Sequence, residues 1–209
     1  MKKLNEKNKK NKNQSAQAGM SYVELIVVLS IFSVMTSVVL FNYGGFQAKV
    51  DIKNLASDIA LKIVEAQKSS LAGKLPPLAQ QLQISPIWKP SYGLYMDQVS
   101  DSKSFIYFTD IDQNGYLSNP VCAPGGECLD KIIITKDNSI SGLKVFYQDG
   151  TSASLNDLIV AFKRPNSGAI INSSSGIIST VSYVEITILS AKAPTATIKI
   201  YPSGRIQVN

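Results

Sequence analysis

The sequence predicts an α+β fold, in which one long N-terminal helix packs on an antiparallel β-sheet domain. Helical patterns occupy residues 20–73, and short segments rich in β-branched and aromatic residues follow from residue 92 to the end. A single helix followed by many strands is typical of α+β domains, because a sheet must bury the apolar stripe of the helix. Turn dipeptides between the strand segments favour antiparallel pairing.

Residues 1–19 predict a basic leader peptide that stays in the cytoplasm. Six lysines and one glutamate give this segment a net charge of +5, whereas the whole chain carries +6, which leaves only +1 for the rest. Cationic flanks of an apolar helix stay on the cytoplasmic side of a membrane. Because the remaining chain is nearly neutral, its bulk charge gives little support to nucleic-acid binding.

Residues 20–47 predict the transmembrane half of the long helix. Within residues 23–41 the only charged residue is Glu24, and the run is about as long as a helix that spans a bilayer. A carboxylate in lipid costs about 2.5–3.5 kcal/mol or more unless a partner neutralises it. We therefore expect another subunit to supply a partner for Glu24.

Residues 48–73 predict the amphipathic half of the same helix, which ends at Gly73. Before it, the pair Gly44-Gly45 predicts a bend or a melted turn, since each glycine costs about 1 kcal/mol in a helix relative to alanine. The apolar stripe has the i, i+3, i+4 spacing of one helix face. Its members are Ile52, Leu55, Ala56, Ile59, Ala60, Ile63 and Val64.

Residues 74–209 predict a β-rich globular domain outside the cytoplasm. Residues 78–90 contain two prolines and predict an irregular connection. Short segments bounded by Gly, Pro, Asn or Asp then predict strands. These segments are 92–96, 104–108, 131–135, 143–147, 158–162, 183–189, 195–201 and 205–208.

Two hairpins are predicted from the dipeptides Asp149-Gly150 and Ser203-Gly204, which are typical of tight turns. Aromatic residues at strand spacing are interpreted as core rather than as a ligand platform. They are Trp88, Tyr92, Tyr95, Phe105, Tyr107 and Phe108.

The stretch Gly19-Met-Ser-Tyr-Val-Glu24-Leu-Ile-Val-Val-Leu resembles the class III signal of type IV pilins and type II secretion pseudopilins. The resemblance implies cleavage by a prepilin peptidase between Gly19 and Met20, N-methylation of Met20, and an assembly role for Glu24. In that family the glutamate neutralises the N-terminal amine of a neighbouring subunit, and phenylalanine usually stands where Met20 does. A plain membrane anchor and a secretory signal are the alternatives, but a secretory apolar region is shorter and would not carry Glu24 at its head.

Three stretches near the C-terminus resemble the closing strands of GspH/FimT-type minor pilins and pseudopilins. They are Ile159-Val-Ala-Phe-Lys-Arg-Pro-Asn-Ser-Gly, Glu185-Ile-Thr-Ile-Leu and Ile198-Lys-Ile-Tyr-Pro-Ser-Gly-Arg-Ile-Gln-Val. The resemblance implies a pilin-like fold and a subunit of a type IV pilus or a type II secretion filament. The implied partners are other pilins or pseudopilins, the prepilin peptidase, an assembly platform protein, an ATPase and membrane lipid. The implied location is the cell membrane, with a single pass and an outer globular domain, and then the filament.

An enzymatic function is the least favoured class. The chain has no histidine, which excludes Ser-His and Cys-His nucleophile pairs and His-bearing zinc sites. No nucleophile elbow or phosphate-binding loop is recognisable. We therefore expect no catalytic residues and, apart from a candidate Ca²⁺, no cofactor.

The segment Asp110-Ile-Asp112-Gln-Asn114-Gly115 matches the first half of an EF-hand loop, in which alternating oxygen ligands and a glycine suit Ca²⁺. The twelfth position, which should be glutamate, is Val121. A later acid, Glu127 or Asp130, would have to reach in. The alternative is an ordinary hairpin turn, because Asp, Asn and Gly are common in such turns.

Cys122 and Cys128 predict a disulfide that closes a small loop. Beyond a membrane this outcome is favoured, and with no other soft ligand the pair is a poor zinc site. A loop this short would stabilise the fold by about 2 kcal/mol. The alternative is a pair of free, buried thiols.

Lys163, Arg164 and Arg205 are the compact basic features near the end of the chain. Some members of the resembled group bind DNA through a Gly-Arg-x-Arg signature in the last hairpin. Here Gly204-Arg205-Ile-Gln lacks the second arginine. A DNA-uptake or adhesion subunit at a pilus tip is therefore the alternative function, with nucleic acid as its partner. Solvated charges on a turn are the simpler interpretation.

Overall fold

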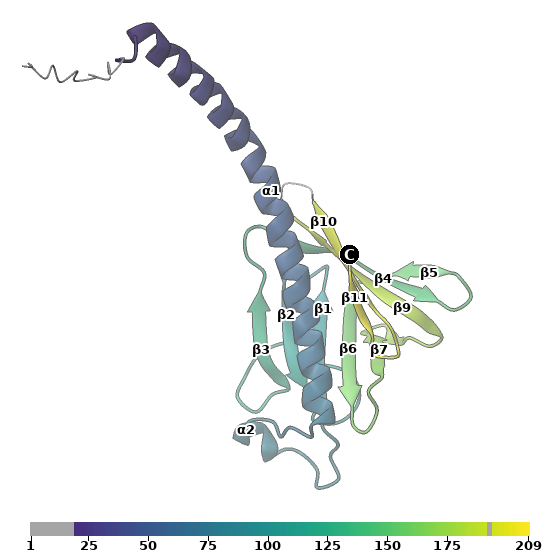
Figure 1. Cartoon of the computed structure of the whole chain (residues 1–209). Coiled ribbons are helices and arrows are strands. Elements are labelled where there is room, and N and C mark those ends of the chain that lie inside the picture. Colours follow the sequence, from purple (N-terminus) through teal and green to yellow (C-terminus); the bar gives the residue numbers. More distant parts are fainter. Residues whose placement is uncertain (1–18, 192–193) are drawn as a thin grey trace, which may run out of the picture. The chain divides into compact units, whose positions relative to one another are not determined.

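The structure is a computed structural model that describes residues 19–191 and 194–209 (Figure 1). Apart from Gly19, the predicted leader lies outside the described residues. The chain divides into two compact units, the first ending at Tyr43 and the second running from Gly44 to Asn209. Each unit is described by itself.

Helix α1, Tyr22–Leu71, is the longest element and belongs to both units. Its backbone stays helical through Gly44-Gly45, so the prediction of a melted turn at this pair is wrong. The propensity cost of about 2 kcal/mol for two glycines relative to alanine is outweighed because a helix propagates cooperatively from the turns on either side. The helix ends close to the predicted position, and Gly73 follows it with a left-handed φ of 70°.

The second unit contains a six-stranded sheet with the order β3-β2-β1-β6-β7-β8 (Figure 1). All of its neighbouring strands pair antiparallel, as the sequence predicts. Its strands are β1 (Ser91–Asp97), β2 (Asp101–Thr109), β3 (Cys128–Ile133), β6 (Asp157–Lys163), β7 (Ala169–Ser173) and β8 (Gly176–Ile177).

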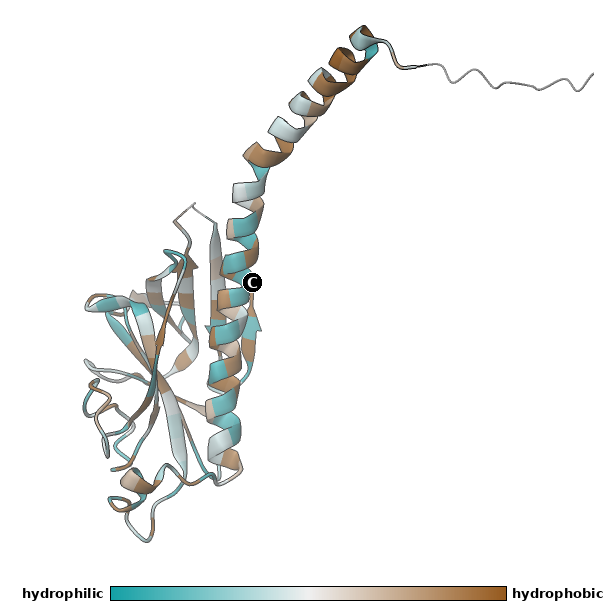
Figure 2. Cartoon of the chain, turned by 90° about the vertical axis from the view of Figure 1, so that its left-hand side faces the viewer, coloured by the Kyte–Doolittle hydropathy of each residue, from teal (hydrophilic) through white to brown (hydrophobic). Residues whose placement is uncertain are grey.

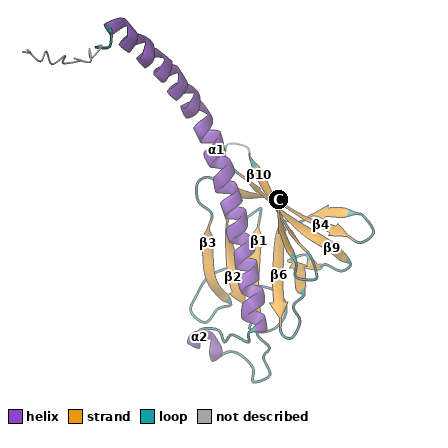
Figure 3. Cartoon of the chain, in the orientation of Figure 1, coloured by secondary structure: helices purple, strands orange, loops and turns teal. Residues whose placement is uncertain are grey.

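A five-stranded sheet with the order β11-β10-β9-β4-β5 completes the second unit, and it is antiparallel throughout (Figure 3). Its strands are β4 (Ser139–Tyr147), β5 (Ser152–Ser154), β9 (Val181–Leu189), β10 (Thr195–Ile200) and β11 (Ile206–Val208). Both predicted hairpins form, between β4 and β5 and between β10 and β11. The α+β fold class is therefore confirmed.

The eight predicted strand segments match described strands. β7 and β8 were not predicted, and β5 was indicated only by the Asp149-Gly150 hairpin turn. A short helix, α2 (Leu78–Gln81), interrupts the segment that was predicted to be irregular. The side chain of Gln80 in α2 donates a hydrogen bond to the carbonyl of Gly126, so α2 contacts the loop before β3.

The main core lies between the C-terminal part of α1 and the inner faces of both sheets. The predicted stripe of α1 supplies Ile52, Ile59 and Ile63, each at most 2% exposed. Figure 2 shows hydrophilic and hydrophobic positions alternating in this part of the helix. Full burial of such side chains contributes about 1.5–3 kcal/mol each, which fixes this half of α1 on the sheets.

Most of the predicted core aromatics are buried in the second unit. Tyr92, Phe105, Tyr107 and Phe108 are each at most 5% exposed. Trp88 and Tyr95 are half-buried at the edges of the two apolar clusters. The aromatic residues therefore serve as core, as the strand spacing predicts.

A second apolar cluster covers the opposite face of the six-stranded sheet. It is made of Ile106, Phe108, Cys128, Ile159 and Ala161. Tyr116 and Leu117 pack against this cluster from the loop that joins β2 to β3. That loop, residues 110–127, therefore forms a cover over the outer face of the sheet.

Candidate functional site

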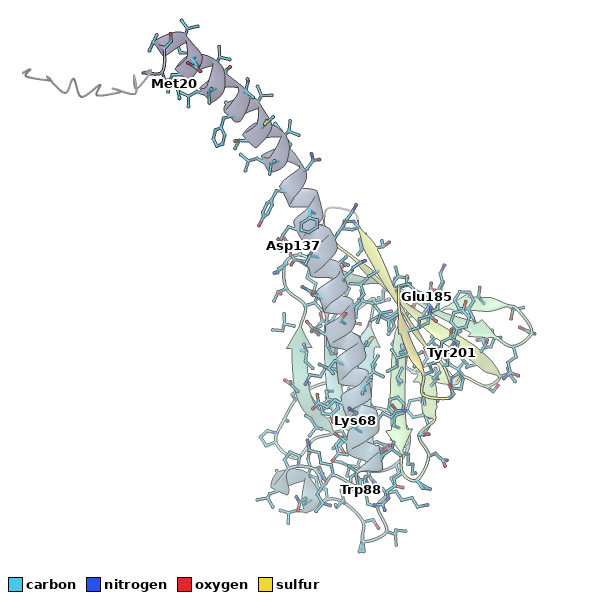
Figure 4. All side chains as sticks on the ribbon, in the orientation of Figure 1. Met20, Lys68, Trp88, Asp137, Glu185 and Tyr201 are labelled. Carbon is cyan, nitrogen blue, oxygen red and sulfur yellow. A yellow bond between two sulfur atoms is a disulfide. The ribbon has the colours of Figure 1, made fainter. Side chains whose placement is uncertain are left out.

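The segment predicted to be processed lies at the start of α1. Gly19 and Met20 precede the helix and are exposed, and Figure 4 places Met20 at its N-terminal end. Glu24 is the acidic residue of the first helical turn. The partial positive charge of a helix N-terminus favours a carboxylate at this position. Among the residues that the structure describes, the ion pairs do not include Glu24.

The first turns of α1 leave their apolar side chains uncovered. Every residue from 19 to 43 is exposed, and Figure 2 shows this end of the helix as predominantly hydrophobic. The helix is long and apolar enough to span a membrane, and none of its most apolar window is buried. Exposed apolar surface of this extent marks a contact with lipid or with other protein.

Three carboxylates come together in the loop between β2 and β3. They belong to Asp110, Asp112 and Glu127, and one oxygen from each lies within 4.8 Å of the others. Asp110 and Glu127 are buried, whereas Asp112 is exposed. The predicted reach of a later acid into the loop is thus made by Glu127, while Asp130 lies outside this group on β3.

Glu127 fastens the loop from within. Its Oε1 accepts a hydrogen bond from the backbone N–H of Ile111 at 3.0 Å, and its Oε2 accepts one from the backbone N–H of Ser118 at 2.7 Å. Charge-assisted bonds of this kind are stronger than neutral ones. One side chain therefore holds two points of the loop that lie seven residues apart in the sequence.

The predicted ligand Asn114 is engaged within the turn. Its amide oxygen accepts the backbone N–H of Tyr116 at 2.6 Å, and its amide nitrogen donates to Asp112 Oδ2 at 2.7 Å. The side chain of Asp112 also accepts the backbone N–H of Asn114 at 3.1 Å. The structure thus brings Asp110 and Asp112 together with Glu127, and Asn114 supports Asp112 from the side.

Asp110 lies deepest in the group. Its Oδ2 accepts hydrogen bonds from Ser91 Oγ at 3.2 Å and from the backbone N–H of Gly115 at 3.1 Å. Burial raises the pKa of the Asp110 carboxyl from 3.8 to about 6, and the charges of Glu127 and Asp112 act in the same direction. A buried carboxylate beside other carboxylates favours a proton or a cation as its neighbour.

The predicted disulfide between Cys122 and Cys128 is present, with its Cα atoms 4.8 Å apart. Cys128 is the first residue of β3 and belongs to the second apolar cluster, which lies on the outer face of the six-stranded sheet and is called the outer apolar cluster below. Cys122 is exposed in the loop. The disulfide therefore ties the end of the loop to the sheet that the loop covers.

The predicted DNA contact, Arg205, lies in the turn before β11. Its guanidinium carbon is 3.9 Å from the ring centroid of Tyr201, which directly follows β10 and is labelled in Figure 4. The cation–π attraction between the guanidinium and the ring stabilises Arg205 in this position. Lys163 is the last residue of β6. Arg164 follows it and is exposed. DNA binding through Arg205 stays a prediction.

Two contacts of the loop between β2 and β3, residues 110–127, escaped the sequence analysis; this loop is called the acidic loop below. The indole N–H of Trp88 donates to the backbone carbonyl of Asp110 at 2.9 Å. The hydroxyl of Ser91 reaches the same residue. No local sequence pattern predicts either contact, because the β1–β2 hairpin separates Trp88 and Ser91 from the loop in the sequence.

No protein-family model, curated protein or solved structure matches the chain. The fold and the site define the class: an α+β protein with a long, apolar N-terminal helix and an antiparallel β domain. This architecture is compatible with a pilin-like fold.

Proposed function

We propose that this chain is a minor pilin or pseudopilin, a subunit of a type IV pilus or of a type II secretion filament. The observation that carries the proposal is the difference between the two ends of α1. One continuous helix exposes apolar side chains on every face at its start and is a core element of the β domain at its end. A single carboxylate, Glu24, stands in its first turn.

The role of Glu24 follows from the energetics of charge in an apolar medium. Cleavage between Gly19 and Met20 would create an ammonium group at Met20, four residues before the carboxylate. Both charges are costly to desolvate alone, and pairing them between adjacent subunits removes two uncompensated charges at once. Because the pair forms at one relative height of two helices, it would also set the axial register of the filament.

The proposed life of the protein has two stages. The precursor is anchored in the cell membrane by the apolar part of α1, with the leader in the cytoplasm and the β domain outside. After prepilin peptidase has removed the leader, an assembly platform protein and an ATPase move the subunit from lipid into a bundle of other pilins or pseudopilins. The role is structural and needs no catalytic group.

The processing step is tested by the N-terminus of the protein isolated from membranes of cells that contain a prepilin peptidase. Wild type should begin at Met20, whereas Gly19→Leu should retain the leader because a bulky side chain blocks the cleavage position. Met20→Phe, which installs the residue usual in the resembled family, is the matched control and should be cut normally. A wild-type chain that still begins at its first residue would refute the proposal.

The assembly step is tested separately with Glu24→Gln, which keeps the shape of the side chain and removes its charge. The variant should be cleaved normally and should then fail to enter sheared filaments. Asp58→Asn, a change of charge on the exposed side of the same helix, is the matched control and should assemble as wild type. Equal incorporation of the Glu24 variant would leave a plain membrane anchor as the better account.

A further inference from the structure

The acidic loop has the dimensions of a calcium site. Oxygens that bind one Ca²⁺ at 2.3–2.6 Å can lie no more than about 5.2 Å apart. The oxygens offered by Asp110, Asp112 and Glu127 lie within 4.8 Å of one another, which meets this limit. Within residues 19–191 and 194–209, the ion pairs do not involve any of these three carboxylates.

An unpartnered oxygen on the most buried of the three carboxylates supplies the second, independent observation. Asp110 is 1% exposed, and although its Oδ2 accepts two hydrogen bonds, its Oδ1 has no partner among the described residues. The nearest side chains of the group, those of Asp112 and Glu127, are themselves acceptors when ionised. A buried carboxylate oxygen without a donor is rare and unfavourable, and a cation is the partner that three converging carboxylates can share.

We propose that the loop between β2 and β3 binds a calcium ion through the carboxylates of Asp110, Asp112 and Glu127. An all-oxygen donor set with three negative charges suits a hard cation and not zinc, because both cysteines form a disulfide and the chain has no histidine. Calcium is favoured over magnesium because it tolerates irregular coordination, whereas magnesium demands a near-ideal octahedron.

Calcium at this position would fasten the cover over the outer apolar cluster. The ion would join the two ends of the loop, Asp110 just after β2 and Glu127 just before β3. Glu127 also holds Ile111 and Ser118, and Tyr116 in the same loop packs on the cluster. Binding would therefore stabilise the native state and keep that cluster away from solvent. This site does not depend on the proposed filament function.

Trp88 makes the proposal directly measurable. It is the only tryptophan of the chain, and its indole N–H donates to the carbonyl of Asp110. The full chain in non-ionic detergent, freed of metal with a chelator, should show a saturable change in tryptophan fluorescence as Ca²⁺ is added. Tb³⁺ should replace Ca²⁺ and show luminescence sensitised by Trp88. Saturating Ca²⁺ should raise the melting temperature by about 5 °C or more.

Matched variants locate the site. Asp112→Asn removes a charge from the exposed ligand and should weaken Ca²⁺ binding by about tenfold or more, because affinity follows the ligand charge. Asp149→Asn removes an exposed acid that also caps a turn, in the β4–β5 hairpin on the other sheet, and should leave the titration unchanged. Circular dichroism checks that Asp112→Asn is folded.

Three results would overturn the proposal. The first is the absence of any fluorescence or calorimetric response up to about 10 mM Ca²⁺, beyond the range of extracellular calcium modules. The second is an unchanged affinity in a folded Asp112→Asn variant. The third is an equal response to Mg²⁺ at the same concentration, which would reject calcium as the ligand. If the variant does not fold, the wild-type comparison of Ca²⁺ with Mg²⁺ decides alone.

Discussion

Replacement of Ile59 by alanine tests whether the second half of α1 is a core element rather than a tether. Ile59 is fully buried within the main apolar cluster. The change deletes three carbon atoms, which at about 0.8 kcal/mol each amounts to about 2.4 kcal/mol of lost transfer free energy. A residual cavity of about 40 Å³ adds about 1 kcal/mol. We expect the free energy of unfolding to fall by about 3–4 kcal/mol.

The assay is urea unfolding of the full chain in non-ionic detergent, followed by the fluorescence of Trp88. With a slope of about 2 kcal/mol per molar urea, the midpoint should fall by about 1.5–2 M. The matched control is Leu61→Ala, two residues along the same helix, because Leu61 is 65% exposed. That variant should change stability by less than about 0.5 kcal/mol. Equal losses in the two variants would refute the packing of this helix face.

Three further predictions concern the β domain. Gly93→Ala should lower the free energy of unfolding by about 1–3 kcal/mol in the same assay, because its Cβ would lie 2.7 Å from the carbonyl oxygen of Val160. Replacing Cys122 and Cys128 together by serine should remove about 2 kcal/mol, since the disulfide spans a separation of 6 residues, and a reductant should bring wild type to the same level. Burial raises the pKa of Tyr92 from 10.0 to about 12. Unfolding frees this phenol to ionise, so stability should fall as pH rises from 10 toward 12, and Tyr92→Phe should flatten that fall in alkaline unfolding curves.

The sequence was most informative where a repeat pattern coincides with burial. The i, i+3, i+4 stripe located the buried face of α1 at Ile52, Ile59 and Ile63. Strands with alternating apolar residues were located as well. β5 was not predicted as a strand segment because it is short and polar, and only the hairpin turn at Asp149-Gly150 indicated a strand paired with β4.

The candidate sites were less predictable, because their geometry depends on contacts between distant segments. The Asp-x-Asp-x-Asn-Gly spacing indicated Asp110 and Asp112, and it also indicated Asn114, whose amide is used by the turn. The position of Glu127 depends on how the loop folds back over the sheet, which no local pattern encodes. The continuous helix at Gly44 likewise reflects cooperativity along α1, and a residue-by-residue propensity misses it.

The continuity of α1 has a mechanical consequence. A tension applied near Met20 would pass along one uninterrupted ladder of backbone hydrogen bonds to the turns that carry Ile59 and Ile63. No slack linker absorbs the load within this helix. A load on the apolar start of α1 would therefore reach the buried side chains at the C-terminal end of the same helix directly.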